Sequence, residues 1–316
     1  MKNNLKLRYG ENPHQVPSYV HFEKKTNSPL KNLKKLIGRE LSYVNFTDIA
    51  AGLETVRMFK EPAVVVIKHN SPSGIALGKD SEEALRRAVQ ADPVSAFGGV
   101  VVLNHPIDEK TAKAFSDFKE DRVQMDIVAA PSVSSKAEKI IHKVRKTTGI
   151  YTFGKIPKKR SDWKHLKFFD GGYVSQPWDD DIEKSFKEWK TVTKRKPTKQ
   201  QLKQMQIAWK FISRIRSNTI IVVDKLLPMT RGIGSSQTAR IFSTEIALKH
   251  AGKHTKGAIL ASDSFFPFPD SVSLAAKHGI AGIVQQGGSV NDQASIDAAN
   301  KADISMVFTY RRAFWH

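Results

Sequence analysis

The chain of 316 residues contains no cysteine, so it forms no disulfide, holds no metal through a thiolate and has no cysteine nucleophile. It also lacks any stretch close to the roughly 20 consecutive apolar residues that a membrane-spanning helix needs. Its first residues carry no apolar core of signal-peptide length. We therefore expect a soluble, cytoplasmic protein that is long enough for two lobes.

Acidic residues are scarce relative to basic ones, because 31 Asp and Glu against 51 Lys and Arg give a formal net charge of +20. Such an excess favours anionic partners, either nucleic acid or small phosphates and carboxylates. No zinc-finger spacing, RNA-recognition signature or basic zipper accompanies the basic runs. Two interpretations stay open at this point: solvated basic faces on an enzyme, or a basic RNA-binding protein.

Short β-branched runs alternate with helical patterns along the chain. Strands are predicted at 63–69, 98–104, 218–224, 257–263 and 280–289, and helices at 80–91, 236–252 and 270–279. Continuous apolar strands alternating with helices predict an α/β fold with a largely parallel sheet covered on both faces. Asp80 is expected to cap the first helix in a capping box with Glu83, and Asp270 to cap the third.

The centre of the chain, residues 170–197, differs from both halves. It is turn-rich and charged, with segments such as FFDGGYVSQPWDDD and KRKPTKQ. Such composition is typical of a connection between lobes. We therefore predict an N-terminal lobe over 1–180 and a C-terminal lobe over 181–316.

The stretch VVVIKHNSPSG ends an apolar run in Lys68 and His69, and its Ser, Pro and Gly predict a turn directly afterwards. Sites in α/β proteins gather at the ends of parallel strands, where loops form a crevice. One interpretation is a strand end that simply meets water. The other is a site in which the neutral imidazole of His69 acts as a general base. The ammonium of Lys68 would keep that imidazole neutral and stabilise developing negative charge.

Four further segments carry residues that could bind a ligand. In LRYGENPHQ, Arg8 could hold a phosphate and Tyr9 could stack on a base. Glycines 98 and 99 indicate either close backbone approach to a ligand or a tight turn. The segment GIGSSQTAR, residues 232–240, is either an anion cradle at a helix start or an ordinary loop. SDSFFPFPD, residues 262–270, is either a core cluster or an aromatic wall for a flat ring.

Together these segments resemble the AICAR transformylase family, the formyl-transfer domain of bifunctional purine-biosynthesis proteins. The similarity runs from about residue 7 to residue 316, and the motifs follow the family's order: LRYGENPHQ, VIKHNSPSGIA, ADPVSAFGG, VTKRKPT, SNTIIVV, GIGSSQTAR, SDSFFPFPDS and QQGGSVND. The preceding inosinate cyclohydrolase domain has no counterpart, so the resemblance implies a stand-alone transformylase with a separate cyclohydrolase acting downstream.

The resemblance also implies the architecture. It suggests two similar α/β/α lobes of cytidine-deaminase-like type, in a homodimer whose subunits share active sites. A deaminase of that fold holds zinc through His and Cys with a Glu acid/base. This chain has no cysteine and no H-x-E segment placed for it, so we expect no zinc site and no metal in the chemistry. A requirement for a monovalent cation stays open.

The reaction implied is formyl transfer from 10-formyltetrahydrofolate to the 5-amino group of AICAR, a ribonucleotide. By resemblance, His69 is the base and Lys68 is the transition-state stabiliser. The positions that match nucleotide-binding residues, His69 among them, are Arg8, Tyr9, His69, Gly98, Asp126, Asn218 and Arg312. The positions that match donor-binding residues are Arg240, Ile241, Phe265, Asp270, Ser289 and Val290.

The chain departs from the family pattern at Ser73, Ser236, Thr238 and Pro269. The last three departures cluster on the donor side, so a different formyl donor, such as a modified folate or pterin, is an open alternative. A basic RNA-binding protein on an inactive enzyme scaffold is a second alternative. The intact Lys68–His69 pair argues against it, and we expect neither nucleic acid nor membrane as a partner.

Overall fold

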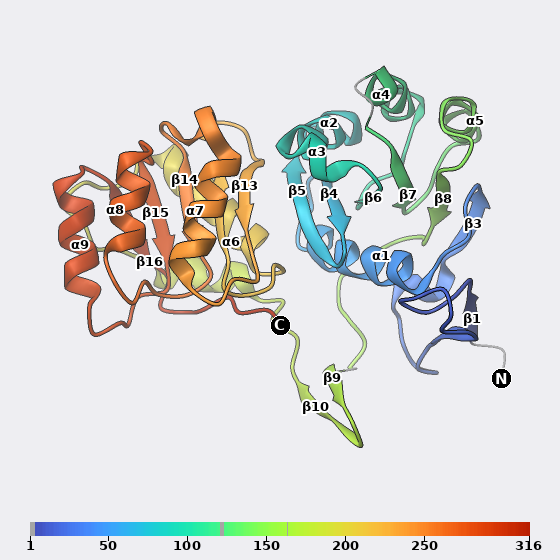
Figure 1. Cartoon of the computed structure of the whole chain (residues 1–316), viewed down its shortest axis with the longest axis horizontal. Coiled ribbons are helices and arrows are strands. Elements are labelled where there is room, and N and C mark those ends of the chain that lie inside the picture. The colour runs from blue at the N-terminus through green and yellow to red at the C-terminus, as the bar shows by residue number, and fades with distance from the viewer. Residues whose placement is uncertain (1–3, 121–122, 163) are drawn as a thin grey trace.

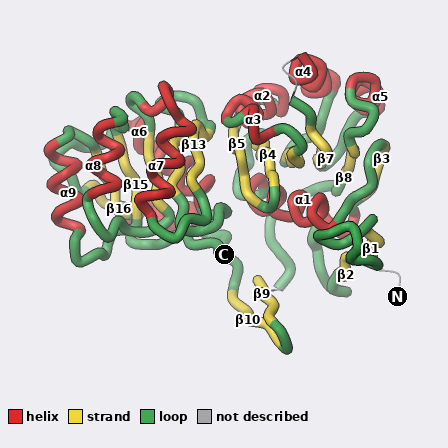
Figure 2. Tube along the Cα trace, viewed as in Figure 1, coloured by secondary structure: helices red, strands yellow, loops and turns green. Residues whose placement is uncertain are grey.

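Two six-stranded sheets form the two halves of the molecule, each covered by helices on both faces (Figures 1 and 2). The computed structural model describes residues 4–120, 123–162 and 164–316. The first sheet has the order β3 (Lys34–Ile37), β8 (Gly149–Thr152), β7 (Met125–Ala130), β6 (Gly99–Leu103), β4 (Ala63–Lys68), β5 (Ser71–Leu77). The second has the order β11 (Lys190–Thr191), β16 (Ser305–Phe308), β15 (Gly282–Gln285), β14 (Ile259–Ser262), β12 (Ile220–Val223), β13 (Thr230–Gly234).

The two sheets repeat one pairing pattern. Read in these orders, successive strand pairs are antiparallel, parallel, parallel, antiparallel and antiparallel in both sheets. Four of the six strands in each sheet therefore point the same way, and the predicted pair of similar, mostly parallel α/β lobes is confirmed. The boundary near residue 180 stays a prediction.

Strand alternation separates the core into layers. In the first lobe, Val65 and Ile67 face α1 (Tyr43–Val56), whereas Val64 and Val66 face the layer of the other helices. Those helices are α2 (Ser81–Ala91), α3 (Pro93–Ala96), α4 (Glu109–Glu120) and α5 (Ser135–Val144). In the second lobe the corresponding layers are α6 (Lys199–Ile212) on one face and α7 (Arg240–Ala251), α8 (Asp270–Lys277) and α9 (Asp292–Lys301) on the other.

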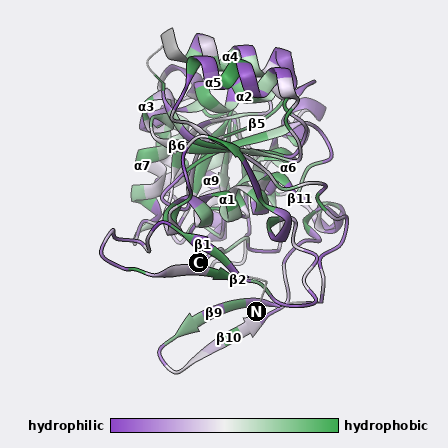
Figure 3. Cartoon of the chain, turned by 90° about the vertical axis from the view of Figure 1, so that its right-hand side faces the viewer, coloured by the Kyte–Doolittle hydropathy of each residue, from purple (hydrophilic) through white to green (hydrophobic). Residues whose placement is uncertain are grey.

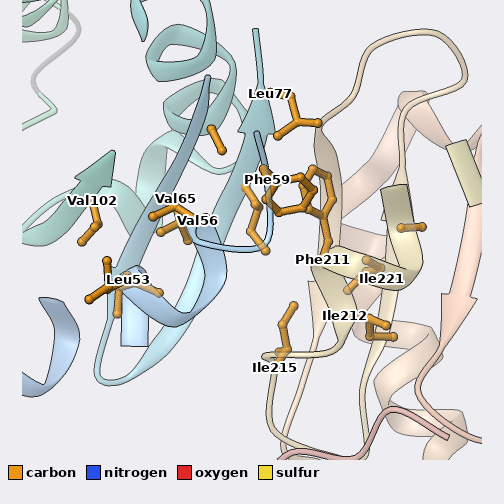
Figure 4. Packing of buried hydrophobic residues seen from close by; sticks show 14 of the residues in the cluster. Leu53, Val56, Phe59, Val65, Leu77, Val102, Phe211, Ile212, Ile215 and Ile221 are labelled. Carbon is orange, nitrogen blue, oxygen red and sulfur yellow. The ribbon is translucent and has the colours of Figure 1, made fainter. Parts of the chain in front are cut away.

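The lobes meet edge to edge where β5 lies beside β13. Ala76 forms an isolated antiparallel bridge with Met229, and the backbone N–H of Leu77 donates to the Pro228 carbonyl oxygen at 2.8 Å. Below this seam the ring of Phe59, just after α1, packs 5.4 Å from that of Phe211 in α6 (Figure 4). Burying each such ring stabilises the folded state by roughly 1.5–3 kcal/mol. The buried residues of the α1 and α6 layers belong to one continuous core.

Two small hairpins lie outside the sheets. One pairs β1 (Asn4–Leu7) with β2 (Ser18–His21), and the other pairs β9 (His165–Phe169) with β10 (Gly172–Gln176). The β9–β10 hairpin projects away from both lobes (Figures 1 and 3). A two-stranded hairpin is marginally stable alone in water, and this one exposes four large apolar side chains: Phe168, Phe169, Tyr173 and Val174.

Some local predictions are confirmed and others are wrong. Asp80 caps α2 by accepting from the Glu83 N–H at 2.9 Å, but the Glu83 carboxylate accepts from the Lys79 N–H instead of closing a box with Asp80. Asp270 is the first residue of α8, not its cap, since Pro269 occupies the cap position. The helix predicted from residue 236 begins only at Arg240.

Candidate active site

Lys68 and His69 lie at a tight hairpin between β4 and β5. Lys68 pairs with Ser71 in the ladder, so the connection has only two residues, His69 and Asn70. Their φ angles are 55° and 60°, the left-handed values that a type I′ turn requires at both positions. The predicted Ser-Pro-Ser-Gly turn is therefore wrong: those residues form the start of β5, and the turn precedes them.

The position of this hairpin also corrects the expected site edge. Strand β4 runs antiparallel to β6, with Ile67 opposite Val100. The carboxyl end of β4 therefore lies beside the amino ends of β6 and β7, not at the carboxyl ends of the parallel strands. This mixed pairing brings the Lys68 end of β4 close to Gly98 and to the start of β7.

A buried carboxylate lies beneath the turn. Helix α1 is capped by a reciprocal Ser42–Asn45 capping box, and one turn further Asp48 is only 4% exposed. The Asn70 N–H donates to Asp48 Oδ1 at 2.6 Å. Burial raises the pKa of Asp48 to about 6, although the Asn70 N–H and the nearby His69 oppose that shift. Sequence reasoning missed Asp48 because its partner is a backbone group 22 residues away.

Lys68 is held by the segment between α3 and β6. Its Nζ donates to the Phe97 carbonyl oxygen at 2.8 Å. The next residue, Gly98, has φ 73°, and a Cβ added there would meet nothing within 4 Å. The surface over Gly98 is therefore open, whereas a Cβ at Gly99 would lie only 3.0 Å from the Ala96 oxygen. Gly98 is thus left-handed with open space above it, Gly99 packs closely against Ala96, and the approach of a ligand to Gly98 stays a prediction.

The same end of the first sheet carries other residues that are predicted to contact a nucleotide. Asp126 lies in β7 beside the Gly98 strand and forms an ion pair with Arg39, a residue that sequence reasoning missed. The guanidinium carbon of Arg8 lies 4.9 Å from the Tyr9 ring centroid, and the Arg8 N–H donates to the Leu41 oxygen, next to the start of α1. Arg8, Gly98 and Asp126 thus lie on the Lys68 end of the sheet.

In the second lobe, Asn218 and Arg240 form one buried network. Arg240 Nη2 donates to Asn218 Oδ1 at 2.8 Å, and its Nη1 pairs with the fully buried carboxylate of Asp263. Asn218 Nδ2 donates to the Gln237 oxygen at 2.9 Å. The Arg240 side chain is therefore engaged inside the protein, so any role in donor binding would pass through Asn218 or the backbone.

The remaining positions that are predicted to contact a formyl donor are more accessible. Phe265 and Val290 are exposed, Asp270 lies on the surface at the start of α8, and Ile241 and Ser289 are half-buried. Phe266 is fully buried, so the aromatic segment divides between core and surface. The loops after β14 and β15 are joined where the Asn291 side chain donates to the Pro267 oxygen at 2.7 Å. Arg312 is exposed in the C-terminal tail, its guanidinium carbon 4.5 Å from the Phe314 ring centroid.

The segment GIGSSQTAR is explained by packing. Glycines 232 and 234 lie in β13, where an added Cβ would meet the Ala247 and Ser243 oxygens of α7 at 2.0 Å. The next residue, Ser235, lies beside the β4–β5 hairpin that carries Lys68 and His69, because its Oγ is 3.4 Å from Ser71 Oγ. A cavity of about 230 Å³ at this point is lined by residues of both lobes, including Lys68, His69 and Ser235.

The described contacts divide the candidate residues into two groups. Lys68, His69, Gly98 and Asp126 gather on the first lobe, and Asn218 and Arg240 gather on the second. Between residues that the structure describes, no hydrogen bond or ion pair joins Arg312 or the donor-side positions to Lys68 or His69. Within the same described part of the chain, no cluster of His, Asp or Glu is arranged to hold a metal, and no helix is long and apolar enough to cross a membrane.

Comparison with known proteins identifies the family of the chain. The family model described as AICARFT/IMPCHase bienzyme matches residues 1–250. A bifunctional purine biosynthesis protein PurH from Oceanobacillus iheyensis is 41% identical over 310 residues, which are 98% of this chain and 59% of that protein. PurH proteins from a Thermoanaerobacter species and from Bacillus thuringiensis are each 40% identical over 98% of the chain, covering 58% and 59% of their own length. The chain spans about three-fifths of these relatives, and it belongs to the AICARFT/IMPCHase bienzyme family.

Proposed function

We propose that this protein transfers a formyl group from 10-formyltetrahydrofolate to the 5-amino group of AICAR, within purine biosynthesis. The observation that carries the proposal is the Lys68–His69 pair. Lys68 ends β4 and His69 begins the two-residue turn, and the Lys68 ammonium donates to the Phe97 carbonyl oxygen beside the accessible Gly98. Membership of the family and similarity to PurH proteins support the purine-biosynthetic context.

The chemistry requires a base and a cation at one point. The amine of AICAR is a weak nucleophile because its lone pair is conjugated with the imidazole ring and the carboxamide. In the proposed step His69 takes the amine proton as the nitrogen attacks the formyl carbon. Lys68 stabilises the oxyanion of the tetrahedral intermediate and can supply a proton to N10 as the carbon–nitrogen bond of the donor breaks.

The substrate positions follow the two groups of residues. On the nucleotide side we assign Arg8, Tyr9, Gly98 and Asp126 of the first lobe, with Asn218 and Arg312 of the second. On the donor side we assign the exposed or half-exposed set: Ile241, Phe265, Asp270, Ser289 and Val290. To Arg240 we assign the role of orienting Asn218, because the Arg240 guanidinium is buried against Asp263 and donates to Asn218 Oδ1.

A homodimer with shared active sites would bring the two groups together. Three exposed apolar surfaces support self-association: Phe97 beside Lys68, the Phe265 segment and the β9–β10 hairpin. Light scattering on the purified chain tests the mass, and a Phe168→Ser, Tyr173→Ser double variant tests the hairpin. If sites are shared, mixing an inactive His69→Asn chain with an inactive donor-side Asp270→Ala chain restores activity in mixed dimers. The absence of restoration with proven subunit exchange contradicts shared sites.

A different formyl donor is the second candidate, because Ser236, Thr238 and Pro269 alter the donor side. A formyl-transfer assay with AICAR and a panel of donors decides between them: 10-formyltetrahydrofolate, formylated pterins, and formate with ATP. Formyl-AICAR from the folate supports the proposal, and product from formate and ATP alone overturns the folate-side assignments.

Salt-dependent RNA binding without AICAR binding contradicts both candidates. Repeating the assay in potassium and in choline salts tests for a monovalent cation. A cytoplasmic location completes the proposal.

A further inference from the structure

A second cavity, of about 400 Å³, is lined by residues of both lobes and of the C-terminal tail. Its walls come from residues 26–30, the second half of α1, the segment before β9, the segment after β10, the loop after α6 and the tail. Four arginines line it: Arg57, Arg160, Arg214 and Arg216. The proposed substrate residues Arg8, Lys68 and Arg312 are not part of its lining.

Two of the four arginines are neutralised within the protein. Arg160 forms ion pairs with Glu54 and Asp180, donating to them at 2.8 and 2.6 Å. Arg214 donates to Asp180 Oδ1 at 3.1 Å and to the Asp179 oxygen at 2.7 Å. The carboxylates of Glu54 and Asp180 therefore compensate Arg160 and Arg214, and these two arginines form one fixed wall of the cavity.

Aromatic rings hold that wall in place. The guanidinium carbon of Arg160 lies 3.8 Å from the Trp178 ring centroid, and that of Arg214 lies 5.0 Å from the Trp315 centroid. The His165 ring stacks 4.7 Å from Trp315 and lies 4.6 Å from Trp178. Cations and rings are thus interleaved, and the faces of both tryptophans are covered.

The other two arginines leave a surplus of positive charge. Arg57 has one long contact, 3.5 Å from its Nη1 to Glu54 Oε1, although its side chain is only 11% exposed. Burial lowers the pKa of Arg57 and the neighbouring Arg160 adds to that effect, while Glu54 and Asp180 oppose it only in part. Among the residues that the structure describes, no side chain pairs with the exposed guanidinium of Arg216, and Nε of the 2%-exposed Arg214 has no partner either.

A desolvated guanidinium without full compensation is costly, and a planar guanidinium fork matches the oxygens of a phosphate. We propose that the cavity binds a small phosphomonoester, whose phosphate is held by Arg57 and Arg216 together with the free Nε of Arg214. The cavity is large enough for more than a bare phosphate, and the half-buried hydroxyls of Ser28 and Ser161 line it where a sugar could lie. Asn70 also lines this cavity, so its occupant adjoins the turn that carries His69.

The test measures binding of inorganic phosphate and of ribose 5-phosphate by calorimetry at constant ionic strength, with glutamate as a carboxylate control. We expect both phosphates to bind the wild type and glutamate to bind at least tenfold more weakly. Arg57→Gln and Arg216→Gln should each weaken phosphate binding about tenfold or more, through loss of charge-assisted hydrogen bonds. Arg195→Gln, which removes a surface cation paired with Asp303, is the matched control and should bind like the wild type.

Two outcomes separate this site from the proposed substrate site and from a structural role. Phosphate binding should persist in Arg8→Gln and Arg312→Gln, and its loss there overturns the inference by placing the ion at the substrate site. Arg57→Gln without ligand should melt at or above the wild-type temperature, because it removes an under-compensated cation. A lower melting temperature together with unchanged phosphate affinity shows a purely structural role and overturns the proposal. The measurement needs no formyl transfer, so it stands or fails independently of the proposed function.

Discussion

Replacing Asp48 by Asn should change how the stability of the protein depends on pH. Asp48 has a pKa of about 6 in the folded protein because of burial, against an ordinary value of 3.8. The folded state therefore binds a proton more tightly than the unfolded state between these two values. Its contribution to the free energy of unfolding is present at low pH and is lost as pH rises through about 6.

The magnitude follows from the shift. One pKa unit corresponds to about 1.4 kcal/mol, so Asp48 should make the wild type about 2 kcal/mol less stable at pH 7 than at pH 4, roughly half of it above pH 5. An asparagine side chain does not titrate, so the Asp48→Asn variant lacks this contribution. Subtracting the two curves removes the titrations that both proteins share.

Urea denaturation of both proteins in matched buffers measures this difference. We expect the stability of Asp48→Asn relative to the wild type to rise by about 2 kcal/mol between roughly pH 4 and pH 7. Loss of the Asp48 carboxyl as acceptor for the Asn70 N–H adds an offset that is the same at every pH. A pH-independent difference refutes the reasoning that the buried carboxyl titrates in this window.

Three further substitutions test other parts of the structure. Lys68→Met should slow formyl transfer by about 10²–10³ in single-turnover assays and leave the free energy of unfolding within about 1 kcal/mol of the wild type. A large fall in the free energy of unfolding would instead indicate a structural role for Lys68. Gly98→Ala should cost about 1–2 kcal/mol in urea denaturation because of its φ of 73° alone, and a neutral result contradicts that conformation. Arg240→Met should cost about 3–5 kcal/mol by leaving Asp263 buried without its cation, and a loss below about 1 kcal/mol contradicts the network.

The sequence predicted features whose causes are local. The apolar run before Lys68 forms β4, Asp80 caps α2, and the alternation of strands and helices gives two α/β lobes. Each of these follows from residue type and spacing over a few positions. The resemblance predicts roles for individual residues, which periodicity alone does not indicate, and these roles stay predictions.

Features that depend on distant partners were not predictable. The turn after Lys68 is formed by His69 and Asn70 in left-handed conformations. Neither residue is a glycine, the usual sequence signal for such a turn, so the turn was wrongly predicted in the Ser-Pro-Ser-Gly segment. The antiparallel pairing of β4 with β6, which decides the edge carrying the site, joins segments more than thirty residues apart. Asp48 and Arg39 were missed for the same reason, because their partners lie elsewhere in the chain.

The most direct test of the central claim replaces His69 by Asn, because Asn tolerates the left-handed conformation at φ 55° that Ala does not. His278→Asn, an exposed histidine just after α8, is the matched control. Single-turnover transfer from 10-formyltetrahydrofolate to AICAR should fall by about 10²–10⁴ in His69→Asn, with unchanged melting temperature, and stay at the wild-type rate in the control. A folded His69→Asn protein that transfers formyl groups at the wild-type rate contradicts the account.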